Sequence, residues 1–281
     1  MPHLELADGV PLYYEEHGTG PTVVLVPGWT ITTRFWERQV ADLAADHRVV
    51  TLDLRGAGNS GKTPDRHSLA AYADDLRHVL SALDLKDVTL VGWAMAVSVA
   101  VHLLADGCDR VGRLVWVDHS PRFFATSDWS LGLFGNLTAA AFDGILADLR
   151  HDRITVTRSL LAETMFATPL SEDELSWMTA ELLKTPTEVA VAMLTAVAYT
   201  DLRPLLPSLQ LPVLVVNGGK SAVPSEVGSW LAGALPSARS LVLPEAGHAP
   251  YWDDASGFNA AVRGFVREER ETRQPALERT T

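Results

Sequence analysis

The chain has 281 residues, of which 47% are hydrophobic, enough for one large α/β domain with an inserted subdomain. Its formal net charge of -12 at pH 7 argues against nucleic acid or an anionic membrane as a partner. A single cysteine, Cys108, excludes an internal disulfide framework. Charged residues interrupt every stretch that could be a membrane span, and the first residues lack the regions of a signal peptide, so we expect a cytoplasmic protein without a membrane span.

Short, continuous apolar runs predict strands that are buried on both faces of a sheet. A hairpin around Asp8-Gly9 comes first, and the runs follow at residues 22–26, 49–52, 88–91, 114–117, 213–216 and 240–243. Three-four spacing of apolar residues predicts helices at residues 34–45, 68–84, 224–236 and 255–271. Strands that alternate with helices indicate an α/β fold with a mostly parallel, twisted sheet flanked by helices.

The stretch from 121 to 204 breaks this alternation, because it contains no convincing strand. It predicts helices around residues 129–149, 153–165, 171–184 and 187–199. We interpret it as a helical cap inserted after the sixth strand, over the carboxyl edge of the sheet, where open α/β folds bind ligands. The core then comprises residues 1–120 and 205–281, with a charged tail after about 270 that we expect to fray.

The strand at 88–91 runs into Gly-Trp-Ala-Met-Ala at 92–96, which is followed by a helical pattern. Small residues at 92 and 96 are what a sharp strand-to-helix elbow requires, because bulkier side chains there would collide. The central residue of such an elbow has a strained backbone, and here it is Ala94.

The elbow and three further motifs resemble those of the α/β-hydrolase superfamily, over essentially all of residues 4–271. Val-Pro-Gly-Trp at 26–29 is similar to the family's oxyanion loop. Residues 53–60 resemble its Asp-x-Arg-Gly-x-Gly-x-Ser turn, and Ala-Gly-His at 246–248 resembles its catalytic-histidine loop. The four motifs occur in the family's order, each at a strand end, which makes the resemblance specific.

The resemblance implies a role for each matching residue. His248 would be the general base, and the backbone N–H groups of Trp29 and Met95 would form the oxyanion hole. The family often places the catalytic acid after its seventh strand, but Ser221 stands there in this chain. Some members place it after the sixth strand, where Asp118 is our candidate for the residue that orients His248.

Other interpretations of the acid stay open at this stage. Asp118 could instead cap the turn that follows it, as aspartates before a proline-containing loop often do. Asp201, at the end of the cap, and Asp253, near His248, are weaker candidates for the acid.

Ala94 stands where the resemblance implies a nucleophilic serine, and alanine has no lone pair with which to form an acyl-enzyme. The first explanation is a hydrolase for an apolar ester, thioester or lactone whose serine was replaced to trap a substrate. The second is natural loss, with His248 and Asp118 acting alone as a general base, as in cofactor-free dioxygenases, lyases or cyclases of this fold. The Pro-Gly-Trp loop is also similar to that of such dioxygenases. A non-catalytic ligand receptor is a third class.

Aromatic residues of the cap suggest an apolar small-molecule substrate. The candidates for lining its pocket are Thr30, Trp93, Phe124, Trp129, Phe134 and Tyr199. Ser98 is interpreted as a structural hydroxyl, and His119 as one of several scattered histidines that are not metal ligands. We expect no metal and no cofactor, because HExxH, CxxC and phosphate-binding glycine motifs are absent from the sequence. The oligomeric state stays open.

Overall fold

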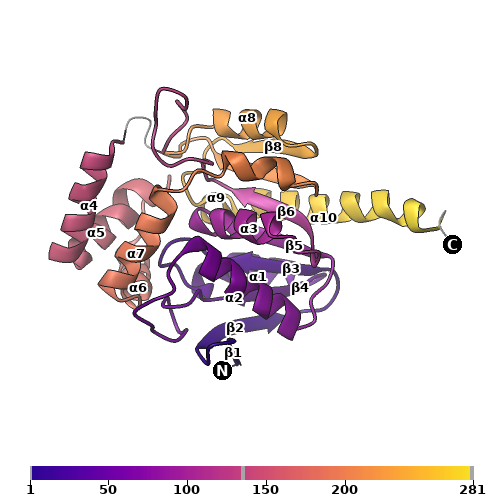
Figure 1. Ribbon diagram of the computed structural model, residues 1–281, viewed down its shortest axis with the longest axis horizontal. Helices are drawn as coiled ribbons and strands as arrows, with labels where there is room; N and C mark the ends of the chain where they lie inside the picture. Colours follow the sequence, from indigo (N-terminus) through magenta and orange to yellow (C-terminus); the bar gives the residue numbers. More distant parts are fainter. Residues whose placement is uncertain (1, 134–136, 279–281) are drawn as a thin grey trace.

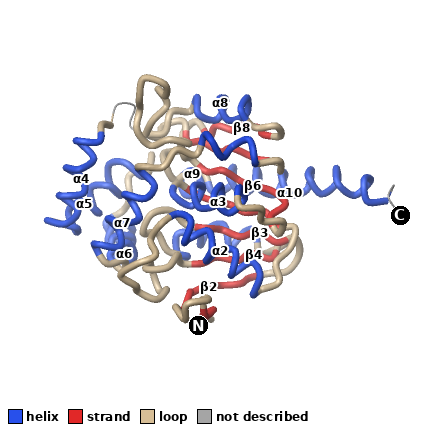
Figure 2. The backbone as a smooth tube through the Cα atoms, in the orientation of Figure 1, coloured by secondary structure: helices blue, strands red, loops and turns tan. Residues whose placement is uncertain are grey.

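The computed structural model describes residues 2–133 and 137–278. Its sheet has eight strands in the order β1-β2-β4-β3-β5-β6-β7-β8 (Figures 1 and 2). The strands are β1 (His3–Glu5), β2 (Pro11–His17), β3 (Thr22–Val26), β4 (Arg48–Leu52), β5 (Val88–Trp93), β6 (Val111–Val117), β7 (Val213–Gly218) and β8 (Ala238–Leu243). The pairs β1–β2 and β2–β4 are antiparallel, and all others are parallel. The predicted α/β class with a mostly parallel sheet is confirmed.

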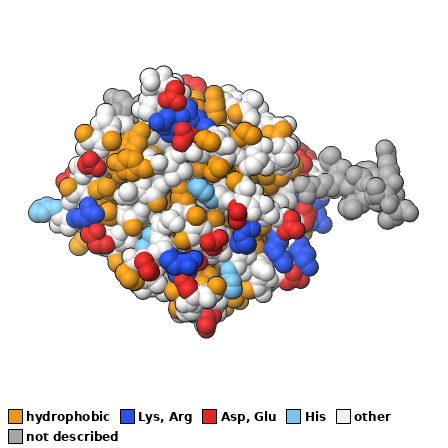
Figure 3. Space-filling model, viewed as in Figure 1, with side chains coloured by type: hydrophobic (Ala, Val, Ile, Leu, Met, Phe, Trp, Pro, Cys, Tyr) orange, Lys and Arg blue, Asp and Glu red, His pale blue; other side chains and the backbone are white. Residues whose placement is uncertain are grey.

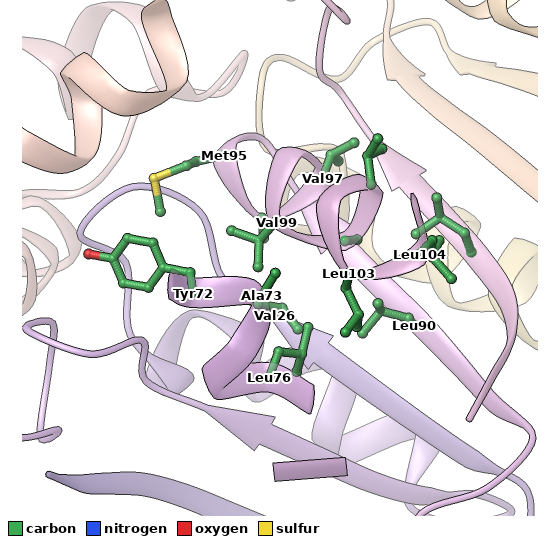
Figure 4. Packing of buried hydrophobic residues seen from close by; sticks show 14 of the residues in the cluster. Val26, Tyr72, Ala73, Leu76, Leu90, Met95, Val97, Val99, Leu103 and Leu104 are labelled. Carbon is green, nitrogen blue, oxygen red and sulfur yellow. The ribbon is translucent and has the colours of Figure 1, made fainter. Parts of the chain in front are cut away.

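Both faces of the sheet are covered, and this explains why its central strands are continuous apolar runs. Successive residues of a strand point to opposite faces, so Val24 packs into one core and its neighbour Leu25 into the other. The core around Val24 contains α2 (Leu69–Ala82) and α3 (Met95–Ala105), whose side chains pack over β3 and β5 in Figure 4. The core around Leu25 contains α10 (Ala255–Glu278). The helices outside residues 139–198 also include η1 (Thr33–Trp36), α1 (Glu37–Leu43), η3 (Arg203–Ser208), α8 (Glu226–Ala234) and α9 (Pro250–Asp253).

Most of the chain between β6 and β7 forms a group of helices beyond one end of the strands (Figure 1). It comprises α4 (Ala139–His151), α5 (Arg153–Ser159), the π-helical turn η2 (Leu160–Met165), α6 (Glu172–Leu183) and α7 (Thr187–Ala198). Side chains start several of these helices by accepting bonds from free backbone N–H groups. Ser171, for example, forms a capping box with Glu174 at the start of α6.

Two predicted helix bounds are wrong. The helix expected around 129–149 begins only at Ala139, because Trp129 lies in a tight turn and its indole donates to the Ser120 hydroxyl at 3.3 Å and the Arg122 carbonyl at 3.2 Å. At the other end of the chain, α10 continues through Glu278, beyond the point where we expect fraying. Among the described residues, no helix has the length and apolarity needed to cross a membrane.

A buried ion pair holds the turn after β4 against α2. The Arg55 side chain is 1% exposed and donates to both carboxylate oxygens of Asp75, at 2.7 and 2.6 Å. Asp8 is its second acidic partner, and together the two carboxylates raise the pKa of Arg55 above its ordinary value, Asp75 contributing most. Elsewhere on the surface, acidic and basic side chains lie close together in exposed groups (Figure 3).

We expect Arg55→Met to lower the free energy of unfolding by about 3–5 kcal/mol, because it leaves the Asp75 carboxylate buried without its charge partner. Arg77→Met is the matched control, since Arg77 pairs with Asp106 at the surface, where such a pair contributes about 0–1 kcal/mol. Urea unfolding measures both variants. Equal losses would show that the buried pair has no special role.

Candidate active site

The elbow between β5 and α3 is strained and closely packed. Ala94 has φ 50° and ψ -121°, a conformation that residues with a Cβ rarely adopt. A Cβ added to Gly92 would lie 3.0 Å from the Ala96 carbonyl oxygen, tighter than ordinary contacts. A Cβ added to Gly28 would lie 3.3 Å from the Ala94 methyl, so the loop at 26–29 also packs closely against the elbow. Glycine at 28 and 92 is therefore a packing requirement.

Two loops at the carboxyl edge of the sheet bring His248 and Asp118 together. The Nδ1 atom of His248 lies 2.7 Å from Oδ2 of Asp118. The Asp118 side chain is fully buried, whereas the His248 side chain is 19% exposed. The Trp93 indole donates to the His248 carbonyl at 2.7 Å and so holds the histidine loop against the elbow. Of the three candidate acids, only Asp118 is hydrogen-bonded to His248 in the part of the chain that the structure describes.

The other two candidate acids have different partners. Asp201 pairs with Arg203, at 2.7 Å. The Asp253 carboxylate accepts from the backbone N–H of Gly247 at 2.8 Å and from that of Ala167 at 3.0 Å. Asp253 therefore fixes the loop that carries His248, without touching the imidazole.

Ser221 contacts the same carboxylate from the next loop along the sheet. Its hydroxyl donates to Oδ2 of Asp118, and the backbone N–H of Gly218 donates to Oδ1 at 2.9 Å. Ser221 thus occupies the strand-seven loop position where we expected an acid in other members of the family. The sequence shows that Ser221 stands where that aspartate would fall. It does not show that the Ser221 hydroxyl contacts Asp118, because that contact depends on the fold.

An apolar cavity of about 450 Å³ opens beside these residues. Ala94, Met95, His248 and Trp29 line it at the sheet edge, and Trp93 is part of the same wall. The cap contributes the rest of the lining, chiefly apolar side chains: Phe142, Ile145, Leu149, Val156, Leu160 and Leu194.

The pocket residues expected from the sequence are only partly correct. Trp93 lines the cavity, and Thr30, Phe124, Trp129 and Tyr199 do not. Thr30 is fully buried outside the cavity lining, and Tyr199 is 58% exposed. Phe124 contacts Phe142 and Tyr199, and Trp129 meets Trp230 edge to face. Phe134, the remaining candidate, lies outside the described residues.

Trp29 connects the oxyanion-type loop to the cap. Its indole N–H donates to the Ala190 carbonyl of α7 at 2.7 Å. The Arg153 guanidinium of α5 lies over its ring, 5.0 Å from the ring centroid. Two cap helices therefore hold the side chain whose backbone N–H we expect in the oxyanion hole.

His119 also lines the cavity, although the sequence gave no reason to place it there beyond its position next to Asp118. Its Nε2 atom lies 2.8 Å from the Ser98 hydroxyl, and Ser98 itself is 1% exposed. Burial, with a smaller contribution from the nearby His248, lowers the pKa of His119 to about 3. The imidazole is therefore neutral near pH 7. Within the described ranges, no group of three or more His, Cys, Asp or Glu residues could hold a metal ion.

Comparison with known proteins identifies the family. The family described as "alpha/beta hydrolase fold" matches residues 21–255. The chain belongs to the α/β hydrolase family. Its sequence is 30% identical over 263 residues to a pimeloyl-[acyl-carrier protein] methyl ester esterase of Vibrio campbellii, covering 91% of this chain and 98% of that protein.

Solved structures agree with this fold. A bromoperoxidase from Bacillus anthracis has a TM-score of 0.86 and 28% identity, covering 92% of this chain and 96% of its own. An esterase from Exiguobacterium antarcticum has a TM-score of 0.88 at 24% identity, covering 94% of this chain and 98% of its own.

We expect Ala94→Gly to raise the free energy of unfolding by about 1 kcal/mol, because glycine adopts positive φ without the strain of a Cβ. Ala100→Gly, in the interior of the following helix α3, is the control, and there glycine should lower stability by about 1 kcal/mol. Chemical denaturation compares the two. A loss at both positions would contradict strain at the elbow.

His119 should make the protein sensitive to acid. Between about pH 6.5 and pH 3, the unfolded chain binds a proton at this imidazole and the folded chain does not, so stability falls as the pH falls. From pH 7 to pH 5 the unaltered chain should lose about 2 kcal/mol more than His119→Asn. His151→Asn, at an exposed position, is the control and should behave as the unaltered chain. Denaturant unfolding at the two pH values gives the result, and parallel losses in all three proteins would argue against a neutral, buried His119.

Proposed function

We propose that this site belongs to a hydrolase-type enzyme for an apolar ester, thioester or lactone, and that Ala94 replaces its nucleophilic serine. One observation carries the proposal: the hydrogen-bonded His248–Asp118 pair and the apolar cavity meet at Ala94. A general base and a substrate pocket are thus assembled around the one position that lacks a reactive atom.

The geometry supports a role for each of these residues. Asp118 accepts the Nδ1–H of His248, which leaves Nε2 as the basic nitrogen that faces the reaction. A serine at 94 would give its proton to this nitrogen and attack the acyl carbon. Met95 is the first residue of α3, so its N–H has no acceptor within the helix. With the N–H of Trp29 it would stabilise the oxyanion.

The wall of the cavity and the relatives support the choice of substrate class. The lining is chiefly hydrocarbon, which fits an acyl chain or another apolar group better than a charged one. The Vibrio campbellii relative is named for a methyl ester of an acyl chain. By analogy, we propose an ester or thioester of an apolar acyl group as the substrate.

A second function uses the same pair without a nucleophile. Because the Ala94 methyl lines the cavity, a substrate could approach His248 and lose a proton to it directly. This would be the chemistry of a cofactor-free dioxygenase, lyase or cyclase. A ligand receptor would use the cavity alone.

We expect Ala94→Ser to create esterase activity towards p-nitrophenyl butyrate, and covalent labelling by a fluorophosphonate probe. A serine nucleophile contributes roughly a millionfold to turnover in enzymes of this type, so the gain should lie far above background. Ala96→Ser is the matched control, since it adds the same hydroxyl two residues further along the same elbow. Adding His248→Ala to Ala94→Ser should abolish the gain.

The outcomes separate the candidates. If Ala94→Ser neither hydrolyses the ester nor reacts with the probe, the hydrolase proposal is wrong. Conversion of a bound compound by the chain with Ala94, lost in His248→Ala, would favour the general-base enzyme. Binding without any conversion in either form would favour the receptor.

A further inference from the structure

His119 is a polar group in the cavity wall to which the chemistry above assigns no role. It follows Asp118 directly, at the end of β6, and Trp116 fixes its backbone by donating to its carbonyl at 2.7 Å. One imidazole nitrogen, Nε2, is hydrogen-bonded to Ser98 at 2.8 Å. Among the described residues, the other ring nitrogen, Nδ1, has no hydrogen-bond partner. It is not fully buried, so it keeps some accessible surface. Since His119 lines the cavity and Nε2 is paired, Nδ1 is the ring nitrogen available to a molecule bound there.

The Ser98 hydroxyl determines which nitrogen carries the ring proton. Ser98 is 1% exposed, and within the described chain the His119 imidazole is the partner of its hydroxyl. If Nε2 carried the proton, it would donate to Ser98, and the serine O–H would be left in the core without an acceptor. The favourable arrangement has the serine donating to Nε2. A neutral imidazole has one N–H, so the proton is on Nδ1.

The Nδ1–H of His119 differs from the other polar groups that line the cavity. The hydroxyls of Thr155, Ser159 and Thr164 rotate and can either donate or accept. The His119 ring is fixed at both its backbone and Nε2, and it presents a donor only. A fixed donor in an apolar wall rejects a ligand that offers it no acceptor, because the donor then stays unpaired.

We propose that His119 is a specificity-determining residue, whose Nδ1–H donates a hydrogen bond to an acceptor oxygen of the substrate, a carbonyl or an ether, inside the cavity. This inference rests on the proposed use of the cavity as the substrate site. It adds to the substrate class: an apolar molecule with an acceptor oxygen placed to meet the end of β6.

The first test is spectroscopic and uses the chain with Ala94, which cannot form an acyl-enzyme. Nitrogen-15 NMR of the labelled imidazoles should show the Nδ1–H form of His119. Cyclohexanone, which carries one acceptor oxygen, should shift the Nδ1 resonance on binding. Methylenecyclohexane, which has a similar shape without that oxygen, should not. An Nε2–H form, or an Nδ1 resonance that cyclohexanone leaves unmoved, would overturn the proposal.

The second test measures how much more tightly cyclohexanone binds than methylenecyclohexane. His119→Phe should reduce this preference about fivefold, the effect of one net hydrogen bond. His119→Asn should retain it, because the asparagine amide N–H lies near the position of Nδ1. His151→Phe, which makes the same exchange at an exposed position outside the cavity lining, is the control and should leave the preference unchanged.

An unchanged preference in His119→Phe would overturn the proposal. If that variant does not fold, Ser98→Ala replaces it: without the serine donor the ring is no longer restricted to the Nδ1–H form, and the preference should fall. Both tests follow binding and not turnover. A failure of Ala94→Ser to hydrolyse esters would therefore leave their results unaffected, so the two proposals fail separately.

Discussion

The site depends on one buried carboxylate. Asp118 is fully buried, and such a charge is tolerated only where hydrogen-bond donors surround it. The donors come from two segments: His248 from the loop after β8, and Gly218 and Ser221 from the end of β7 and the loop that follows it. Because each donor must reach the same two oxygens, Asp118 sets the relative positions of these loops. The orientation of the imidazole follows from that arrangement.

The acid can stand after β6 because β6 and β7 end side by side. β6 and β7 pair in parallel, so the residues after their ends meet at the same edge of the sheet. An acid after either strand can therefore reach the histidine loop. In this chain the aspartate follows β6, and the serine after β7 stabilises its charge. A positive φ of 46° at Asp118 is part of the local geometry that directs the carboxylate there.

The parts of the fold that depend on local sequence could be predicted, and those that depend on packing could not. Buried strands are apolar runs, and the elbow needs small residues, so both are visible in the sequence. Asp118 could be proposed because Ser221 stood at the alternative position. The pocket lining could not, since an aromatic residue of the cap can face either side: Phe142 lines the cavity, whereas Tyr199 lies outside. His119 was missed because its role depends on Ser98, which is 21 residues away in the sequence.

The elbow keeps its strained form although no nucleophile stands there. Two features impose it: the close packing of Gly92 against the start of α3, and that of Gly28 against the Trp93 carbonyl. Sheet pairing adds to this, since the Ala94 N–H donates to the Val117 carbonyl at 3.0 Å. The backbone geometry is therefore a property of β5, β6 and α3, independent of the side chain at 94. For this reason a serine at that position would enter a preformed backbone, with the imidazole and the cavity already beside it.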